Sequence, residues 1–195
     1  MTHSREAMLA LLARLPDAAL QRPRTQAAWS ILEVLGHVAA WETEGARRLA
    51  LIARGQGARI RWYDTDAEID RFNARAVRGW GRLGRATALA RLARARARLV
   101  AALRRLPAAA LADPSHALPV TRWLREFTWT HEAGHRRAIA AWWRATPVSG
   151  ATPASRRGGA APGSESPRRR MARVRRPPAG GRVRRRRGPG SAARP

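Results

Sequence analysis

The sequence predicts an all-α protein, a four-helix bundle followed by a disordered, basic C-terminal tail. Four segments within the first 146 residues carry apolar residues at spacings of three and four, the pattern of helices that bury one face. No segment shows the convincing alternation of a strand. From Pro147 onward Gly, Pro, Ser and Arg predominate, and such a segment cannot bury enough apolar surface to offset its ordering entropy. We therefore expect a helical domain over residues 1–146 and a disordered tail over 147–195.

The first two long helices have recognisable ends. The segment SREAMLALLARL ends at Pro16, and its apolar face consists of Met8, Leu11, Leu12 and Leu15. The segment WSILEVLGHVAAWETEGARRLALIARG opens with Ser30 and Glu33, the spacing of a capping box, and Gly55 and Gly57 end it. Its expected inward stripe is Ile31, Val34 or Leu35, Val38, Trp41, Leu49 and Ile52.

The other two long helices follow a connecting region. A loop, GQGARIRWYDT, leads to a short helix, DAEIDRFNARAVRGW, and then to the long helix ATALARLARARARLVAALRRL, which Pro107 closes. The apolar side of that helix is expected to be Leu89, Leu92, Leu99, Val100, Leu103 and Leu106. The last helix is expected to run unbroken through TRWLREFTWTHEAGHRRAIAAWWRA, with an inward stripe of Leu124, Phe127, Thr128, His131, His135, Ala138 and Trp142.

The composition excludes several kinds of site. There is no cysteine, which excludes disulfides, thiolate metal sites and a cysteine nucleophile. Any transition metal would be held by His, Asp or Glu, which suits zinc, nickel or iron. No apolar run approaches the roughly 20 residues that span a bilayer, and the N-terminus lacks the features of a signal peptide. We therefore expect a cytoplasmic protein that does not bind a membrane.

The positive charge is concentrated in the tail. Residues 147–195 hold fourteen arginines and one acid, and so carry +13 of the net +26. Runs such as RRRMARVRR can neutralise phosphates in a non-specific, salt-sensitive manner, although the tail has no aromatic residue to stack on bases. Two interpretations stay open: the tail contacts nucleic acid non-specifically, or it has no role.

Three of the five histidines are expected to face the interior. His131 and His135 stand four residues apart on the last helix and so lie one above the other. His37 stands between Val34 and Trp41, at spacings of three and four, on the second long helix. Three imidazoles from two helices would form a metal site with an open position, the usual arrangement for catalytic zinc-like ions. The alternative is three ordinary core or boundary histidines.

The same segment has the form of a zinc-protease motif. HEAGH matches H-E-x-x-H, in which Glu132 would be the general base. No third ligand follows further along the chain, and no sheet is predicted, so a protease is not the favoured interpretation.

Three motifs resemble those of the DinB-like superfamily. WSILEVLGHVAAWE (29–42) resembles its second-helix motif, roughly W-S-x-x-E/D-x-L-x-H-x-x-x-W-E, and THEAGHRRAI (130–139) is similar to its last-helix signature. YDTDAEIDRFNARAV resembles the connector of that family, with its Phe-Asn pair at Phe72 and Asn73. The resemblance covers about residues 4–145.

The resemblance implies a fold, a metal site and a class of chemistry. The fold is a four-helix bundle with up-up-down-down connections, and members are often homodimers. Members resemble metal-dependent thiol transferases that use bacillithiol, mycothiol or glutathione, and mycothiol-dependent isomerases; a related branch protects against a DNA-damaging natural product, a stress response. The implied metal ligands are His37, His131 and His135. The substrate would be a small electrophile and the thiol a low-molecular-weight cofactor.

The residues beside the histidines leave alternatives open. Trp41, Thr128 and Trp129 are candidate pocket residues, and for the tryptophans simple core packing is the alternative. Glu42 and Glu132 point about 100° away from the ligands, so they are expected to orient a neighbouring group or to face solvent. A non-catalytic bundle that only binds a metal or another ligand would need the same pocket, so it also remains open.

Overall fold

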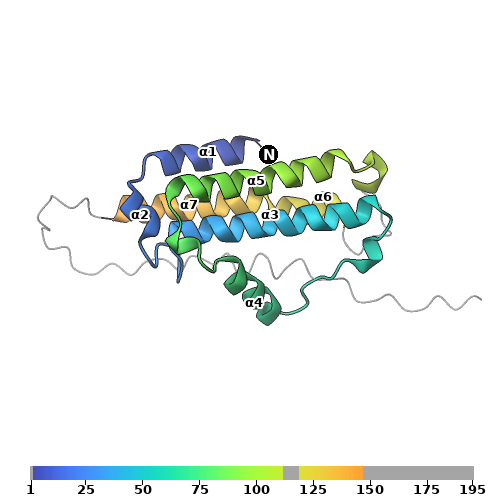
Figure 1. Ribbon diagram of the computed structural model, residues 1–195, viewed down its shortest axis with the longest axis horizontal. Coiled ribbons are helices and arrows are strands. Elements are labelled where there is room, and N and C mark those ends of the chain that lie inside the picture. The colour runs from blue at the N-terminus through green and yellow to red at the C-terminus, as the bar shows by residue number, and fades with distance from the viewer. Residues whose placement is uncertain (1, 112–118, 147–195) are drawn as a thin grey trace, which may run out of the picture.

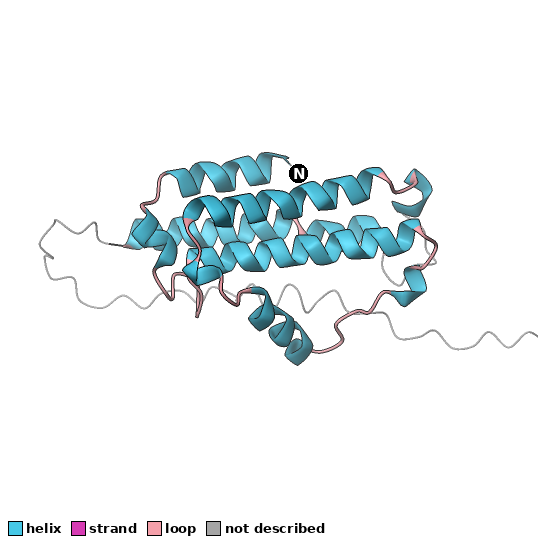
Figure 2. Cartoon of the chain, in the orientation of Figure 1, coloured by secondary structure: helices cyan, strands magenta, loops and turns pink. Residues whose placement is uncertain are grey.

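The computed structural model describes residues 2–111 and 119–146, and within these ranges the chain forms helices, turns and loops without any strand (Figure 2). The bundle consists of α1 (Thr2–Ala13), α3 (Ile31–Ala53), α5 (Arg85–Arg104) and the consecutive pair α6 (Val120–Phe127) and α7 (Trp129–Ala145). The shorter elements are α2 (Asp17–Gln21), α4 (Asp66–Ala76) and the 3-10 turns η1 (Gly57–Arg59), η2 (Trp80–Arg82) and η3 (Ala108–Leu111). The predicted all-α, four-helix bundle is confirmed. The predicted disorder of residues 147–195 lies outside the described residues.

The helix directions differ from the expected up-up-down-down order. In Figure 1, α3 and α5 run in the same direction, whereas α1 and the pair α6 and α7 run in the opposite direction. The cause is the long segment 54–84, which contains α4 and carries the chain back along the bundle before α5 begins. The order is therefore up-down-down-up.

None of the described helices is both long and apolar enough to cross a membrane.

The start of α3 is fixed as the sequence predicts. The backbone N–H of Ser30 donates to Glu33 Oε2 at 2.8 Å, and the backbone N–H of Glu33 donates to Ser30 Oγ at 3.3 Å, which completes the capping box. One turn further on, Gly36 allows the indole of Trp80 to approach closely, because a Cβ atom at this position would lie 2.5 Å from that ring. The end of the connecting segment is thereby held against α3.

The last helix is broken, contrary to the expected unbroken run. Thr128 has φ −124° and ψ −103°, far from helical values, and separates α6 from α7. Its hydroxyl donates to the carbonyl of Leu124 at 2.7 Å, a side-chain bond to the preceding turn that competes with the backbone ladder and bends helices. The break also changes the inward stripe: on α7 the buried residues are Glu132, His135 and Ile139, whereas Ala138 and Trp142 are only half-buried.

The core consists of two apolar clusters with polar residues between them. On α5, Ala95 belongs to one cluster and Leu99 to the other, with Arg96 between them. On the last pair of helices, Phe127 and Ile139 belong to different clusters, and the residues between them include His131, Glu132 and His135. The buried side of α5 carries alanines as well as the expected leucines: Ala88, Leu92, Ala95 and Leu99 are buried, whereas Leu89, Val100 and Leu103 are only half-buried.

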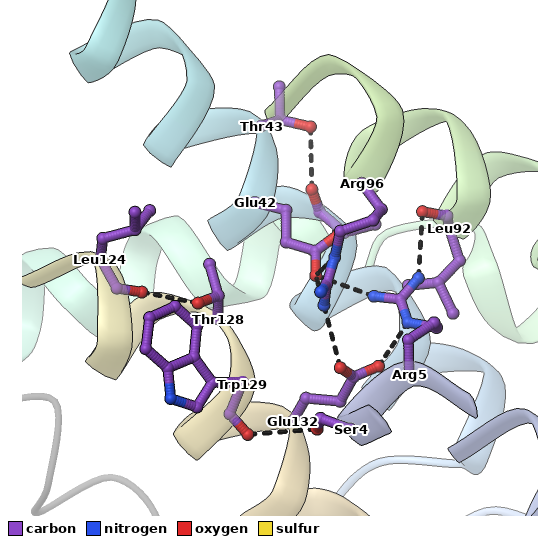
Figure 3. A network of polar contacts seen from close by, with 11 residues as sticks. Ser4, Arg5, Glu42, Thr43, Leu92, Arg96, Leu124, Thr128, Trp129 and Glu132 are labelled. Carbon is purple, nitrogen blue, oxygen red and sulfur yellow. Dashed lines mark hydrogen bonds and ion pairs between the residues drawn. The ribbon is translucent and has the colours of Figure 1, made fainter. Parts of the chain in front are cut away.

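Two glutamates and two arginines form a buried ionic cluster that joins the four members of the bundle: α1, α3, α5 and α7 of the last pair (Figure 3). Arg5 of α1 donates through Nη2 to Glu42 of α3 at 2.8 Å and through Nε to Glu132 of α7. Arg96 of α5 donates through Nη2 to Glu42 at 2.6 Å and to Glu132 at 2.9 Å. Both carboxylates are fully buried, and the cluster is neutral as a whole.

The cluster excludes one of the two alternatives expected for the two glutamates. Glu42 and Glu132 do not face solvent; each is 0 % exposed. Burial raises the pKa of Glu42, and the charges of Arg5 and Arg96 act in the opposite sense. The cluster therefore depends on all four members, since a buried charge without a partner is strongly unfavourable.

Replacement of Arg5 by Met should destabilise the fold by roughly 3–5 kcal/mol, because it leaves two buried carboxylates with one guanidinium. The measurement is the free energy of unfolding by urea denaturation. The control is Arg61→Met, which removes the exposed ion pair between Arg61 and Glu68, with the Arg61 side chain 79 % exposed. That variant should lose under about 1 kcal/mol. Equal losses in the two variants would contradict the role assigned to the cluster.

Candidate metal centre

Three histidines from two helices meet in the interior. His37 projects from α3, and His131 and His135 project from the first two turns of α7. Nε2 of His131 lies 2.8 Å from Nε2 of His37 and 2.8 Å from Nε2 of His135. His37 and His135 are almost fully buried, at 4 % and 2 % exposed, and His131 is half-buried. The structure thus brings together the three histidines singled out in the sequence; their role as ligands stays a prediction.

Hydrogen bonding among the imidazoles does not explain this convergence. An imidazole Nε2 carries either one hydrogen or one lone pair in the ring plane, so Nε2 of His131 can make one good hydrogen bond but has two neighbours at 2.8 Å. Nδ1 of His37 and Nδ1 of His131 are buried and make no hydrogen bond of ordinary geometry within the described residues.

The donor set fits a divalent transition metal. Zinc–nitrogen distances of about 2.0–2.1 Å place neighbouring nitrogens of a tetrahedral site about 3.3 Å apart. The two contacts of 2.8 Å would reach that separation with a small outward shift of the rings. Imidazole is a ligand that suits zinc, nickel and iron.

The protonation state also suits a metal. Burial lowers the pKa of His135 to about 4. Burial, followed by repulsion from His135, holds the pKa of His37 and the pKa of His131 well below the ordinary value of 6.5. All three imidazoles are therefore neutral at pH 7, the form that binds a metal without first releasing a proton.

A loop between α2 and α3 covers part of the cluster. Oε1 of Gln26 lies 2.9 Å from Nδ1 of His135. The indole of Trp29 packs on the ring of His37, with 4.8 Å between the ring centroids. This loop therefore contacts a histidine on each of the two helices.

The three candidate pocket residues have different surroundings. Trp41 is 1 % exposed, donates from Nε1 to Asn73 Oδ1 at 3.1 Å, and packs on Phe72 and Phe127 with centroid distances of 4.6 Å. Its ring also meets His37 edge-on, at 6.4 Å between centroids. Thr128 is fully buried and its hydroxyl is occupied by the bond to Leu124 that accompanies the helix break. Trp129 is half-buried, and its carbonyl accepts a hydrogen bond from Ser4 of α1 at 3.2 Å (Figure 3).

The geometry is unfavourable for the protease interpretation of HEAGH. Both carboxylate oxygens of Glu132 are engaged by guanidinium groups, Oε1 by Arg5 and Oε2 by Arg96. A general base needs a free oxygen directed at the water beside the metal. Glu132 instead holds α7 to α1 and α5.

Three residues were not predicted from the sequence: Gln26, which contacts His135, and Arg5 and Arg96, which hold Glu132 beside His131. Arg5 and Arg96 stand on the inner faces of amphipathic helices, where a charged residue indicates a buried partner. The sequence pattern could therefore have predicted their ion pairs. Gln26 lies in an irregular loop, and neither periodicity nor spacing indicates that its side chain reaches a histidine 109 positions away.

The chain was also compared with models of known protein families. The model of the DinB superfamily matches residues 1–139, which include all three histidines and the four members of the ionic cluster. The match covers well over half of the chain, so the chain belongs to the DinB superfamily. No curated protein and no solved structure matches it.

The stability of the metal-free protein should fall as the pH is lowered from about 6.5 towards about 4. In this window the unfolded chain takes up protons at these histidines, whereas the folded protein keeps them neutral, so unfolding is favoured at the lower pH. Each histidine contributes at most about 1.4 kcal/mol per pH unit. Urea denaturation in the presence of a chelator measures the slope. A variant with Gln at positions 37, 131 and 135 should have a shallower slope; identical slopes would contradict the burial of neutral imidazoles.

Proposed function

We propose that this member of the DinB superfamily is a divalent-metal-dependent enzyme that transfers a low-molecular-weight thiol to a small electrophile. His37, His131 and His135 would hold zinc, nickel or iron. The observation that carries the proposal is the convergence of the Nε2 atoms of three histidines, with two contacts of 2.8 Å that no set of hydrogen bonds among the rings satisfies.

The charge of the ligand set favours activation of a nucleophile. Three neutral imidazoles leave a divalent ion its full charge, and such an ion lowers the pKa of a bound water or thiol towards neutrality. The chain itself has no cysteine, so a thiol in this reaction must come from a small molecule. The thiol itself is inferred from the resemblance to the DinB-like superfamily, which also suggests a homodimer. We propose that the protein is cytoplasmic.

The residues around the cluster would hold the ligands and exclude water. The indoles of Trp41 and Trp29 both lie beside the ring of His37, at centroid distances of 6.4 and 4.8 Å. The ionic cluster fixes the neighbouring turns, because Glu132 follows His131 directly and Glu42 follows Trp41. Precise placement of ligands by their supporting residues is what a catalytic metal site requires.

The metal content of the purified full-length chain tests the proposal. We expect about one ion per chain, held by three ligands, and none in a variant with Ala at positions 37, 131 and 135. The control is the double variant His3→Ala and His116→Ala, which removes the two other histidines and should keep its metal. The metal-loaded protein should then consume a thiol together with an electrophile, and the triple variant should not. A metal-free parent after incubation with zinc, nickel and iron would contradict the proposal, and metal without thiol consumption would favour a binding protein.

A second candidate function is a non-catalytic bundle that contacts nucleic acid non-specifically. Besides the basic tail, a groove of about 240 Å³ between α3 and α5 favours it. Three exposed arginines of α5 line this groove, and none forms an ion pair with a carboxylate of the described residues: Arg91, Arg94 and Arg98. Like charges at these helical spacings repel one another, and a phosphate between them would relieve the repulsion.

Salt dependence distinguishes the groove from general charge. The slope of log affinity for duplex DNA against log salt measures how many phosphates are neutralised. If the groove binds phosphates, replacing its three arginines by Gln should reduce the magnitude of this slope by up to roughly 2.7. A control with the same loss of charge at the exposed residues Arg14, Arg54 and Arg59 should change the slope much less. Truncation after Thr146 measures the contribution of the tail. Equal slopes in the two arginine variants would reject the groove.

A further inference from the structure

The loop that covers the histidines is a closed turn with an unusual backbone. The N–H of Gln26 donates to the carbonyl of Trp29 at 3.0 Å, and the N–H of Trp29 donates to the carbonyl of Gln26 at 3.0 Å. Two residues that are not glycine, Arg24 and Ala27, have positive φ values of 59° and 53°. Such values are sparsely populated for alanine and persist only where the surrounding structure imposes them.

Several contacts impose this conformation. Thr25 is buried, and its hydroxyl donates to the carbonyl of Arg22 at 2.8 Å. Trp29 directly precedes Ser30, whose capping box fixes the first turn of α3. The turn is therefore anchored on both sides, and Gln26 is presented to α7 from a defined backbone position.

The contact with Gln26 determines which ring nitrogen of His135 carries the hydrogen and which carries the lone pair. A neutral imidazole carries its hydrogen on one nitrogen and its lone pair on the other. In the described geometry the amide oxygen of Gln26 faces Nδ1 of His135 at 2.9 Å, so it can accept a hydrogen bond only if Nδ1 carries the hydrogen. Nε2, which faces His131 and His37, then keeps its lone pair. The other tautomer would place a hydrogen on Nε2 and prevent it from binding a metal.

We propose that Gln26 is a positioning residue that sets the tautomer and orientation of His135 before a metal arrives, so that the loop 22–30 prepares the ligand. This inference rests on the proposed function for its consequence, metal affinity, but the tautomer is a property of the metal-free chain. Partners that orient metal-binding histidines typically contribute 10–100-fold to metal affinity.

The first arm measures the tautomer in the full-length, metal-free chain. Nitrogen chemical shifts of His135, read at pH 7 through long-range proton–nitrogen NMR correlations, distinguish a hydrogen on Nδ1 from one on Nε2. We expect the hydrogen on Nδ1 in the parent and in Gln26→Glu, since a carboxylate also accepts from Nδ1. In Gln26→Leu the hydrogen should shift towards Nε2. A parent with its hydrogen on Nε2, or a Leu variant with the tautomer of the parent, overturns the proposal.

The second arm measures zinc affinity by competition with a chelator. Gln26→Leu should bind zinc about 10–100-fold more weakly, and Gln26→Glu should bind as tightly as the parent or more tightly. Two controls should bind like the parent: Gln21→Leu makes the same change at an exposed position of α2, and Ala27→Gly relaxes the positive φ while keeping the Gln26 side chain. Parent-like zinc affinity in Gln26→Leu overturns the role of Gln26.

The two arms separate this inference from the proposed function. If the parent binds no zinc, the proposed function fails, and the tautomer of His135 still decides whether Gln26 positions the ring. If Gln26→Leu loses zinc because it unfolds, circular dichroism reveals this, and the Gln26→Glu variant still tests whether an acceptor at position 26 determines the tautomer.

Discussion

The burial of two carboxylates in the centre of a helical bundle is the constraint on which this structure depends. Glu42 and Glu132 are fully buried, and two guanidinium groups from the remaining long helices neutralise them. Removing either arginine would leave a buried charge, which is far more costly than breaking an exposed ion pair. The cluster therefore couples α1, α3, α5 and α7, because displacing one of them leaves a buried charge on another without its partner.

This constraint acts directly on the histidine cluster. His131 and Glu132 are neighbours on α7, so the helix presents one to the cluster of imidazoles and the other to the arginines. The same holds on α3 for His37 and Glu42, which lie little more than one turn apart. Charged groups are thus paired on one side of these helices, while the imidazoles on the other side are uncharged because burial lowers their pKa. The charges in the middle of the bundle are balanced without any contribution from the histidines.

The regular helical spacing in the sequence was enough to predict the long helices and the face on which two of the histidines lie. Helical periodicity and the capping box at Ser30 located the long helices, and the spacing of His131 and His135 placed both on one face. It could not predict the break at Thr128, because a threonine inside a helix bonds to the preceding turn only when tertiary packing favours it. Nor could it predict the loop 22–30, whose positive φ angles at Arg24 and Ala27 occur at residues without any intrinsic preference for them. The helix directions required knowing that residues 54–84 return along the bundle.

These unpredicted features are the ones that complete the site. The break at Thr128 starts α7 as a separate helix at Trp129, two residues before His131, so the imidazoles follow a helix axis that differs from that of α6. The irregular loop brings Gln26 and Trp29 onto two histidines that belong to different helices. The helical spacing places His131 and His135 on one face, and the acceptor beside Nδ1 of His135 comes from the loop. A metal site needs both, since ligands are useful only when their orientation is fixed. The regular elements therefore determine where the histidines are, and the irregular ones determine how they are held.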